Sequence, residues 1–163
     1  MLRVFSSFCN LDFADLMAVY EESNRANGAE NWPNESTGTQ ILFAEQEFRQ
    51  YLREIFFKTS GAVYCTWIVS GKYVSAMRLE PYRDGMLLEA LETAPDSRGK
   101  GYAQSLIRDF VSRYPGKIYS HIHKHNTPSI RVHLKCGFRK IADNAVYVDG
   151  SFTHKSATYL LEV

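Results

Sequence analysis

The chain has 163 residues, a length that corresponds to a single domain, 1–163, able to bury about 68–70% of its unfolded surface. Its 19 basic and 18 acidic residues are spread along the chain and give a net charge of +1, which indicates neither a nucleic acid nor a membrane as partner. No apolar segment is long enough to span a membrane, no export signal opens the chain, and the three cysteines form no C-x-x-C pair, so we expect a cytoplasmic protein with reduced, buried thiols.

The start of the chain predicts a short strand and a helix. Residues 2–5 form the strand, and Asn10 or Asp12 can cap a helix that ends at Asn27-Gly28. The apolar face of this helix carries Phe13, Leu16, Met17 and Tyr20. These residues are spaced as one face of a helix that packs on a core.

A second helix is expected over about 39–57. Its inward face carries Ile41, Ala44, Phe48, Tyr51, Leu52 and Ile55. The polar segment 28–36 separates the two helices and contains Trp32. This segment could line a binding cleft, or Trp32 could pack under the helix pair.

Three strands come next. Residues 62–69 and 72–80 are rich in β-branched and aromatic side chains and are joined by Ser70-Gly71, which predicts a hairpin. Asp84-Gly85 then turns the chain into a strand over 86–93. The three strands are predicted to form an antiparallel meander.

A glycine-rich bend, residues 98–103, follows the last of these strands and leads into a helix. The apolar face of that helix carries Ala103, Leu106, Ile107, Phe110, Val111 and Tyr114. Small residues and a helix N-terminus at one place predict an anion site, best suited to phosphate. The spacing is neither that of a P-loop nor that of a dinucleotide fingerprint, which would need a third glycine at Gln104.

The last part of the chain completes a mixed α/β domain. Residues 117–124 should pair parallel to the strand over 86–93, since a strand-helix-strand unit makes a right-handed crossover. Thr127-Pro128 can start a helix, with Thr127 as its cap, and Gly137 can end it. Strands are then expected over 138–141, 145–148 and 153–163.

The glycine bend resembles motif A of the Gcn5-related N-acetyltransferases, Arg/Gln-x-x-Gly-x-Gly/Ala, through Arg98, Gly101 and Ala103. Leu91 to Pro95 resembles the strand end that precedes it, with Thr93 in place of the usual Val. A second landmark of the family matches at Asn126, Ser129, His133, Lys135, Gly137 and Phe138, with His133 where relatives commonly have Tyr. The resemblance covers roughly 73–163.

The resemblance implies a mostly antiparallel sheet splayed between strands four and five, flanked by four helices, with acetyl-CoA as cosubstrate. Backbone amides of the glycine bend would hold the pyrophosphate. The residues implied there are Arg98, Gly99, Lys100, Gly101, Tyr102, Ala103 and Gln104. Backbone groups of Leu91, Glu92 and Thr93 would pair with the pantetheine arm, and Asn126 would bond it from the other side. An unpaired N–H near Leu91 to Thr93 would face the thioester oxygen.

Two carboxylates on the strand over 86–93 are candidates for the general base. Strict alternation places Glu89 and Glu92 on opposite faces unless a bulge intervenes, so at most one should face the cleft. Glu89 shares parity with the carboxylate that some members of the family use as base. Solvated strand residues are the structural alternative for both.

Histidines offer a second route for protons. His121, His123 and His125 alternate along the strand over 117–124, but no further ligand joins them at short range, so we predict no metal. His121 could act as the base, because the pKa of a free histidine is about 6.5. His133 could protonate the departing thiolate in place of the family's Tyr, or it could simply pack.

Three functions remain open at this point. The first is acetyl transfer from acetyl-CoA to an amine of a small molecule, and the second is transfer to an amine of a protein. The third is an acyl-CoA-binding regulatory domain without turnover, which the departure at His133 keeps open. A homodimer is a fair expectation, since exposed strands near the C-terminus commonly pair in this family.

Overall fold

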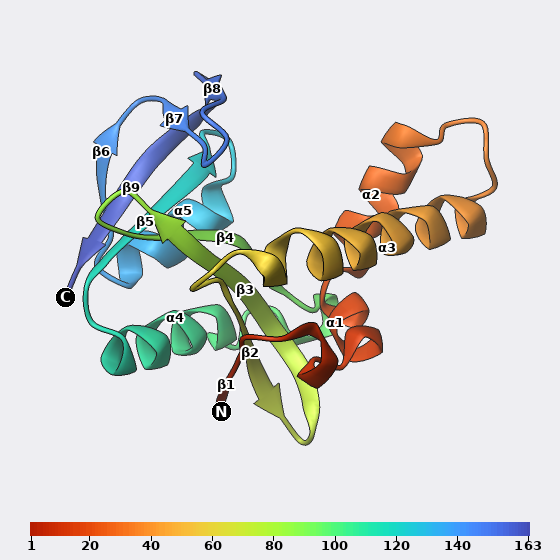
Figure 1. Cartoon of the computed structure of the whole chain (residues 1–163), viewed down its shortest axis with the longest axis horizontal. Coiled ribbons are helices and arrows are strands. Elements are labelled where there is room, and N and C mark those ends of the chain that lie inside the picture. Colours follow the sequence, from red (N-terminus) through yellow and green to blue (C-terminus); the bar gives the residue numbers. More distant parts are fainter.

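The computed structural model describes all residues from 1 to 163. Figure 1 shows a twisted sheet with helices on both faces. Seven strands pair in the order β1-β2-β3-β4-β5-β9-β6. They are β1 (Leu2–Phe5), β2 (Val63–Val69), β3 (Lys72–Tyr82), β4 (Gly85–Thr93), β5 (Lys117–His123), β6 (Arg139–Ala142) and β9 (Ser156–Glu162). A separate hairpin is formed by β7 (Ala145–Val146) and β8 (Phe152–Thr153).

The chain has five α-helices. They are α1 (Phe13–Val19), α2 (Glu21–Asn31), α3 (Thr37–Glu54), α4 (Tyr102–Arg113) and α5 (Thr127–Lys135). Single 3₁₀ turns occur at Phe8–Asn10, Phe56–Lys58 and Pro95–Ser97. None of the helices has the length and apolar character needed to cross a membrane.

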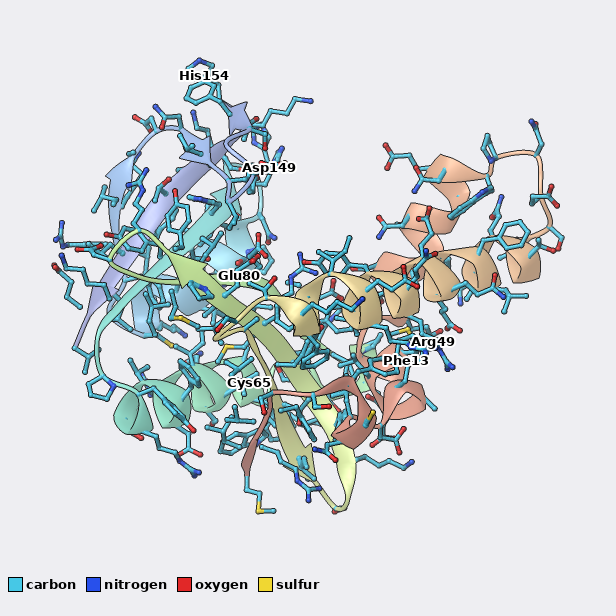
Figure 2. The ribbon with its side chains drawn as sticks, in the orientation of Figure 1. Phe13, Arg49, Cys65, Glu80, Asp149 and His154 are labelled. Carbon is cyan, nitrogen blue, oxygen red and sulfur yellow. The ribbon has the colours of Figure 1, made fainter.

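Two hydrophobic cores lie on opposite faces of the sheet. On one face, Leu106, Ile107, Phe110 and Val111 of α4 pack against the sheet around the buried Cys65 (Figure 2). On the other face, side chains of α1 and α3 pack around Tyr64. The expected periodicity of α4 is therefore confirmed. Tyr114 lies beyond the end of this helix and is half exposed.

The cysteines match the prediction only in part. Cys65 is buried and Cys136 is half-buried, but Cys9 is exposed, and all three are free thiols. Burial raises the pKa of the Cys65 thiol, which makes it unreactive.

The predicted strand meander is confirmed, and so is the parallel pairing of β4 with β5. The N-terminal helices differ from the prediction of a single helix up to Asn27-Gly28. Asp12 caps α1 by accepting from the N–H of Asp15 at 3.0 Å, but the helix stops at Val19 and α2 starts at Glu21. This break raises the number of helices from the expected four to five.

Gly28 lies inside α2 and does not end a helix. A Cβ atom at Gly28 would come within 2.5 Å of the Gln40 carbonyl oxygen, so glycine allows α2 to pack closely on α3. Figure 1 shows these two helices running side by side away from the sheet. Their outer surface includes Arg49, whose guanidinium lies 4.4 Å from the centroid of the Phe13 ring and ties α3 to α1 (Figure 2).

Two predictions for the C-terminal part are wrong in detail. The cap of α5 is Asn126 and not Thr127, because the Asn126 Oδ1 accepts from the N–H of Ser129 at 3.2 Å. The segment predicted as one strand over 153–163 is divided into β8 and β9. Its first residue, Thr153, pairs with Ala145 of β7 across the turn at Asp149-Gly150 and does not join the main sheet.

Candidate active site

The loop between β4 and α4 presents a row of free backbone donors. Gly99 and Gly101 have φ angles of +75° and +80°, the left-handed conformation that favours glycine. No N–H group from Gly99 to Gln104 donates to a backbone carbonyl, and no side chain caps α4. These donors gather at the N-terminus of a helix of 12 residues, whose dipole adds positive potential. The geometry suits a phosphate group.

Two cationic side chains flank this loop. Arg98 donates from Nε to the Thr93 carbonyl at 3.2 Å, and its Nη2 lies 2.7 Å from Glu22 of α2. Lys100 donates to the carbonyl of Asp96 at 3.0 Å. Arg98 and Lys100 are exposed and retain further N–H donors, so both can also contact an anion in the loop.

The sheet opens between β4 and β5, as expected. The parallel ladder holds only three residue pairs and ends at Leu88 and Ser120, although the strands continue to Thr93 and His123. Beyond Leu88, β4 is paired with β3 alone. Its other edge, from Leu91 to Thr93, can therefore pair with an extended chain that is not part of the protein.

A β-bulge shapes the same part of β4. Ala90 has a φ angle of +49°, unusual for a residue with a side chain, and Met77 of β3 faces two residues because Arg78 pairs with Glu89 and Ala76 with Glu92. The bulge overrides the alternation that put Glu89 and Glu92 on opposite faces. Both carboxylates point to the side covered by α1, α2 and α3, where each has a partner.

Two buried tyrosines hold the bulge. The hydroxyl of Tyr20 donates to the carbonyl of Ala90 at 2.6 Å and accepts from the hydroxyl of Tyr64 at 2.8 Å. Burial, together with the neighbouring Tyr64, raises the pKa of Tyr20 well above its usual value, so the hydroxyl stays protonated. The break between α1 and α2 thus places a hydrogen-bond donor under the bulge.

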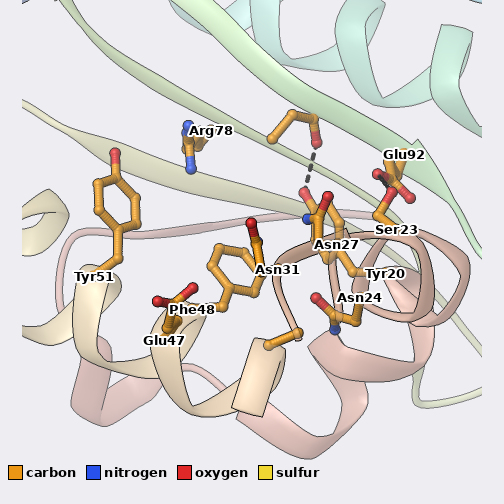
Figure 3. Close-up of a pocket in the computed structure, with 12 residues that line it drawn as sticks. Tyr20, Ser23, Asn24, Asn27, Asn31, Glu47, Phe48, Tyr51, Arg78 and Glu92 are labelled. Atoms are coloured by element: carbon orange, nitrogen blue, oxygen red, sulfur yellow. Dashed lines mark hydrogen bonds between the residues drawn. The ribbon is translucent and has the colours of Figure 1, made fainter. Parts of the chain in front are cut away.

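A pocket of about 370 Å³ lies between this bulge and the pair α2 and α3 (Figure 3). Its lining is Tyr20, Ser23, Asn24, Asn27, Asn31, Ala44, Glu47, Phe48, Tyr51, Arg78, Ala90 and Glu92. Figure 3 shows the side chains of α2 and α3 facing Arg78 and Glu92 across the opening. The pocket joins an apolar floor to a polar rim.

Glu92 is the carboxylate at the inner wall of the pocket. It accepts a hydrogen bond from the Ser23 hydroxyl of α2. Burial raises the pKa of Glu92, while Ser23 and Arg98 oppose that shift. A raised pKa brings a carboxylate closer to the range in which a general base works.

Glu89 does not line the pocket, and its carboxylate is already paired with Arg78. Its Oε2 accepts from the Nε of Arg78 at 3.1 Å, and the Arg78 guanidinium lies 4.9 Å from the centroid of the Tyr51 ring. Burial and the negative charge of Glu89 raise the pKa of the neighbouring Glu80. These residues form one acidic network around a single cation.

His121 holds the β7–β8 hairpin to the sheet. Its Nε2 donates to the carbonyl of Val146 at 3.0 Å, and its Nδ1 lies 3.1 Å from the hydroxyl of Thr158. Tyr82 and Tyr147 pack their rings against the imidazole. Burial lowers the pKa of His121. The Nε2 proton is therefore used within the protein, and the ring does not line the pocket.

The other predicted histidines are placed differently. His123 ends β5, and His125 lies in the following turn, where its N–H donates to the His123 Nδ1 at 3.3 Å. His133 is 1% exposed, and its Nδ1 donates to the carbonyl of Ser129 at 2.8 Å, which leaves Nε2 with a lone pair and no partner. Burial lowers the pKa of His133 and so disfavours the imidazolium that a proton donor requires. No three His, Cys, Asp or Glu side chains come together to hold a metal ion.

The prediction from sequence missed most of the pocket. Three asparagines recur at helical spacing on α2, namely Asn24, Asn27 and Asn31. The helix has no apolar stripe, so the sequence predicted a loop where its last turn lies. Trp32 does not line the pocket and packs instead against Phe43 of α3, with ring centroids 5.5 Å apart. The recurrence of asparagine every three or four residues is the signal that could have revealed this face.

Known proteins resemble this chain in sequence pattern and in fold. The sequence profile of the acetyltransferase (GNAT) family matches residues 17–138 of the chain. No curated protein matches the sequence. Among solved structures, PaiA N-acetyltransferase from Thermoplasma acidophilum in complex with coenzyme A gives a TM-score of 0.67 at 12% identity, over 100% of this chain and 99% of that chain.

Two further structures share the fold. Ribosomal-protein-alanine N-acetyltransferase from Brucella melitensis gives a TM-score of 0.59 at 15% identity, over 100% of this chain and 99% of that chain. The aminoglycoside acetyltransferase AAC(6')-Ib in complex with coenzyme A gives 0.62 at 17% identity, over 99% of this chain and 94% of that chain. At these identities the likeness concerns the fold alone.

Proposed function

The chain belongs to the GNAT acetyltransferase family, and from this premise we propose that it transfers the acetyl group of acetyl-CoA to a primary amine of a small molecule. One observation carries the proposal. The segment from Ala90 to Gln104 joins a pocket with a half-buried carboxylate, an unpaired edge of β4 and a row of free N–H donors at the start of α4.

The cofactor fits the residues along this segment. The N–H groups from Gly99 to Gln104 would hold its pyrophosphate, and the free edge of β4 from Leu91 to Thr93 would pair with the pantetheine arm. Asn126 uses Oδ1 to cap α5, and its amide group stays exposed and free to donate to that arm. Two proteins of the same fold bind coenzyme A, which supports this assignment. Bound there, acetyl-CoA supplies an activated thioester.

Glu92 is our candidate for the general base. An alkylamine is protonated at neutral pH, and Glu92 lies in the pocket with a raised pKa, so its carboxylate would take the proton of the ammonium. The amine nitrogen then forms a C–N bond with the acetyl carbon, and the C–S bond breaks with its electron pair leaving on sulfur. The nitrogen loses its second proton as the amide forms, and that proton passes to the departing thiolate through solvent. A backbone N–H beside the bulge would donate to the carbonyl oxygen.

The remaining candidates take other parts in this proposal. Glu89 neutralises Arg78 and holds its guanidinium in place, and His121 holds the β7–β8 hairpin to the sheet. His133 would donate to the thiolate only as an imidazolium, which its burial disfavours. The thiolate therefore leaves without a proton from this side chain.

The pocket favours a small acceptor because its volume is about 370 Å³ and it is bounded by α2 and α3 on one side and by β3 and β4 on the other. The alternative is a protein amine, as in the ribosomal-protein-alanine N-acetyltransferase of the same fold, while the aminoglycoside acetyltransferase is named for a small acceptor. A regulatory domain that binds acyl-CoA without turnover is the third possibility.

Two measurements separate these functions. Coenzyme A should raise the melting temperature of the protein, and thiol should be released from acetyl-CoA when small primary amines are added. Release with peptides alone would assign a protein acceptor. Stabilisation by coenzyme A without release in any amine mixture would assign the regulatory domain, and absence of stabilisation would contradict the cofactor site.

A further inference from the structure

The acceptor pocket is surrounded by more negative than positive charge. Glu47 and Glu92 line it, and Glu80 and Glu89 stand next to Arg78, the one cation in its wall. Arg78 is already bound to Glu89 at 3.1 Å, and the two side chains are only 21% and 19% exposed. An acceptor therefore enters an electronegative site, which attracts cations more strongly than a neutral one.

Amide oxygens extend this acceptor-rich surface along α2. Asn24 is 4% exposed, and its Nδ2 contacts the sulfur of Met17 at 3.3 Å. Its Oδ1 has no donor in the protein, while the side chain lines the pocket. Asn27 and Asn31 follow on the same side of the helix (Figure 3). An amide oxygen in the lining of a pocket that has no donor in the protein can accept from an N–H group of a ligand.

The floor between the carboxylates is apolar. Ala44, Phe48 and Tyr51 of α3 line the pocket, and Ala90 of the bulge adds to this apolar surface. An alkyl chain can lie on these side chains, and the aromatic rings also attract an ammonium group. The pocket thus has a carboxylate at the reacting end, an apolar middle, and a second set of oxygen acceptors on the helices.

We propose that the acceptor is a diamine or longer polyamine, in which one amine is acetylated beside Glu92 and a second ammonium binds between Glu47 and the asparagines of α2. An ammonium has three donors and no acceptor, which matches a wall of carboxylate and amide oxygens. This inference rests on the proposed function and adds the chemical class of the acceptor. After transfer, the second ammonium is unchanged and the product keeps its positive charge.

The test compares α,ω-diaminoalkanes of three to six carbons with n-alkylamines of the same length, so that only the second ammonium differs. We expect kcat/KM to be at least about tenfold higher for the best diamine, as for one charge-assisted contact. Glu47→Gln should remove most of this difference. Glu45→Gln makes the same charge change on α3 at a residue that does not line the pocket, and it should keep the full ratio.

A second measurement is independent of turnover. Calorimetry of the protein with the diamine alone should detect binding that weakens in sodium chloride and in Glu47→Gln, because screening and loss of charge act on the same contact. Equal kcat/KM for diamines and alkylamines would overturn the inference and leave the proposed function standing. Acetylation of no amine would contradict the proposed function, and in that case calorimetry without diamine binding would overturn the inference as well.

Discussion

Replacing Tyr20 by Phe tests whether the bulge in β4 depends on the two buried tyrosines. The change removes one oxygen atom and keeps the ring that packs against Phe48. It deletes the 2.6 Å bond to the Ala90 carbonyl and the 2.8 Å bond from Tyr64. Ala90 must then keep its φ angle of +49° without the group that binds its carbonyl.

The expected loss in the free energy of unfolding follows from the burial of the Ala90 carbonyl, which loses its donor. A buried carbonyl that loses its donor costs about 1–3 kcal/mol, against about 5–15 kcal/mol for the unfolding of a typical domain, so Tyr20→Phe should fold. Each kcal/mol lowers Tm by about 2–4 °C at this size. Losing an oxyanion donor outright costs about 10²–10³ in kcat, and a relaxed bulge only displaces that donor, so we expect about a tenfold loss of kcat.

The assay is thiol release from acetyl-CoA at saturating amine, together with thermal unfolding. Tyr64→Phe leaves the bond between Tyr20 and Ala90 in place, so it should lower Tm with a smaller loss of kcat. Tyr73→Phe is the control, because its hydroxyl accepts from the N–H of Asp12 at 3.2 Å and does not touch the bulge. It should lower Tm alone. A Tyr20→Phe protein with lower Tm and unchanged kcat would refute a role of this bond in catalysis.

Three further predictions concern the loop, the base and the buried histidine. Gly101→Asp should abolish the shift of Tm by coenzyme A, whereas Gly101→Ala, with the same strained φ angle but no charge, should retain part of it; equal shifts would contradict the phosphate site. Burial raises the pKa of Glu92, so the stability that this group contributes is present at low pH and is lost as pH rises through its folded pKa. Glu92→Gln should therefore raise Tm at neutral pH, lose this advantage near the ordinary glutamate pKa of about 4.3, and lower kcat by about 10²–10⁴ if Glu92 is the base. His133→Phe removes an unpartnered Nε2 and should keep or raise Tm while leaving the basic side of the pH–rate profile in place. Loss of that basic limb would restore the proton-donor role, and His133→Tyr should then preserve most of the rate.

The parts predicted correctly from sequence are those with local causes. The apolar spacing of residues 103–111 identifies α4, because apolar residues that recur at the helical period within one short segment predict both the helix and its buried face. Gly99 and Gly101 indicate a loop with positive φ angles, because glycine has no side chain and adopts this conformation without strain. Ser70-Gly71 likewise marks the hairpin of β2 and β3. The loop that we propose for the cofactor can therefore be outlined from the amino-acid sequence alone.

The proposed acceptor pocket depends on contacts between segments that are far apart in the sequence. Tyr20 reaches Ala90 across 70 positions, and Ser23 reaches Glu92 across 69, so neither pairing leaves a local pattern in the chain. The bulge that turns Glu89 and Glu92 to one side sits at an alanine, a residue that gives no sign of a positive φ angle. Only the tertiary structure supplies the hydrogen bonds that hold this conformation, and the position of the candidate base depends on them.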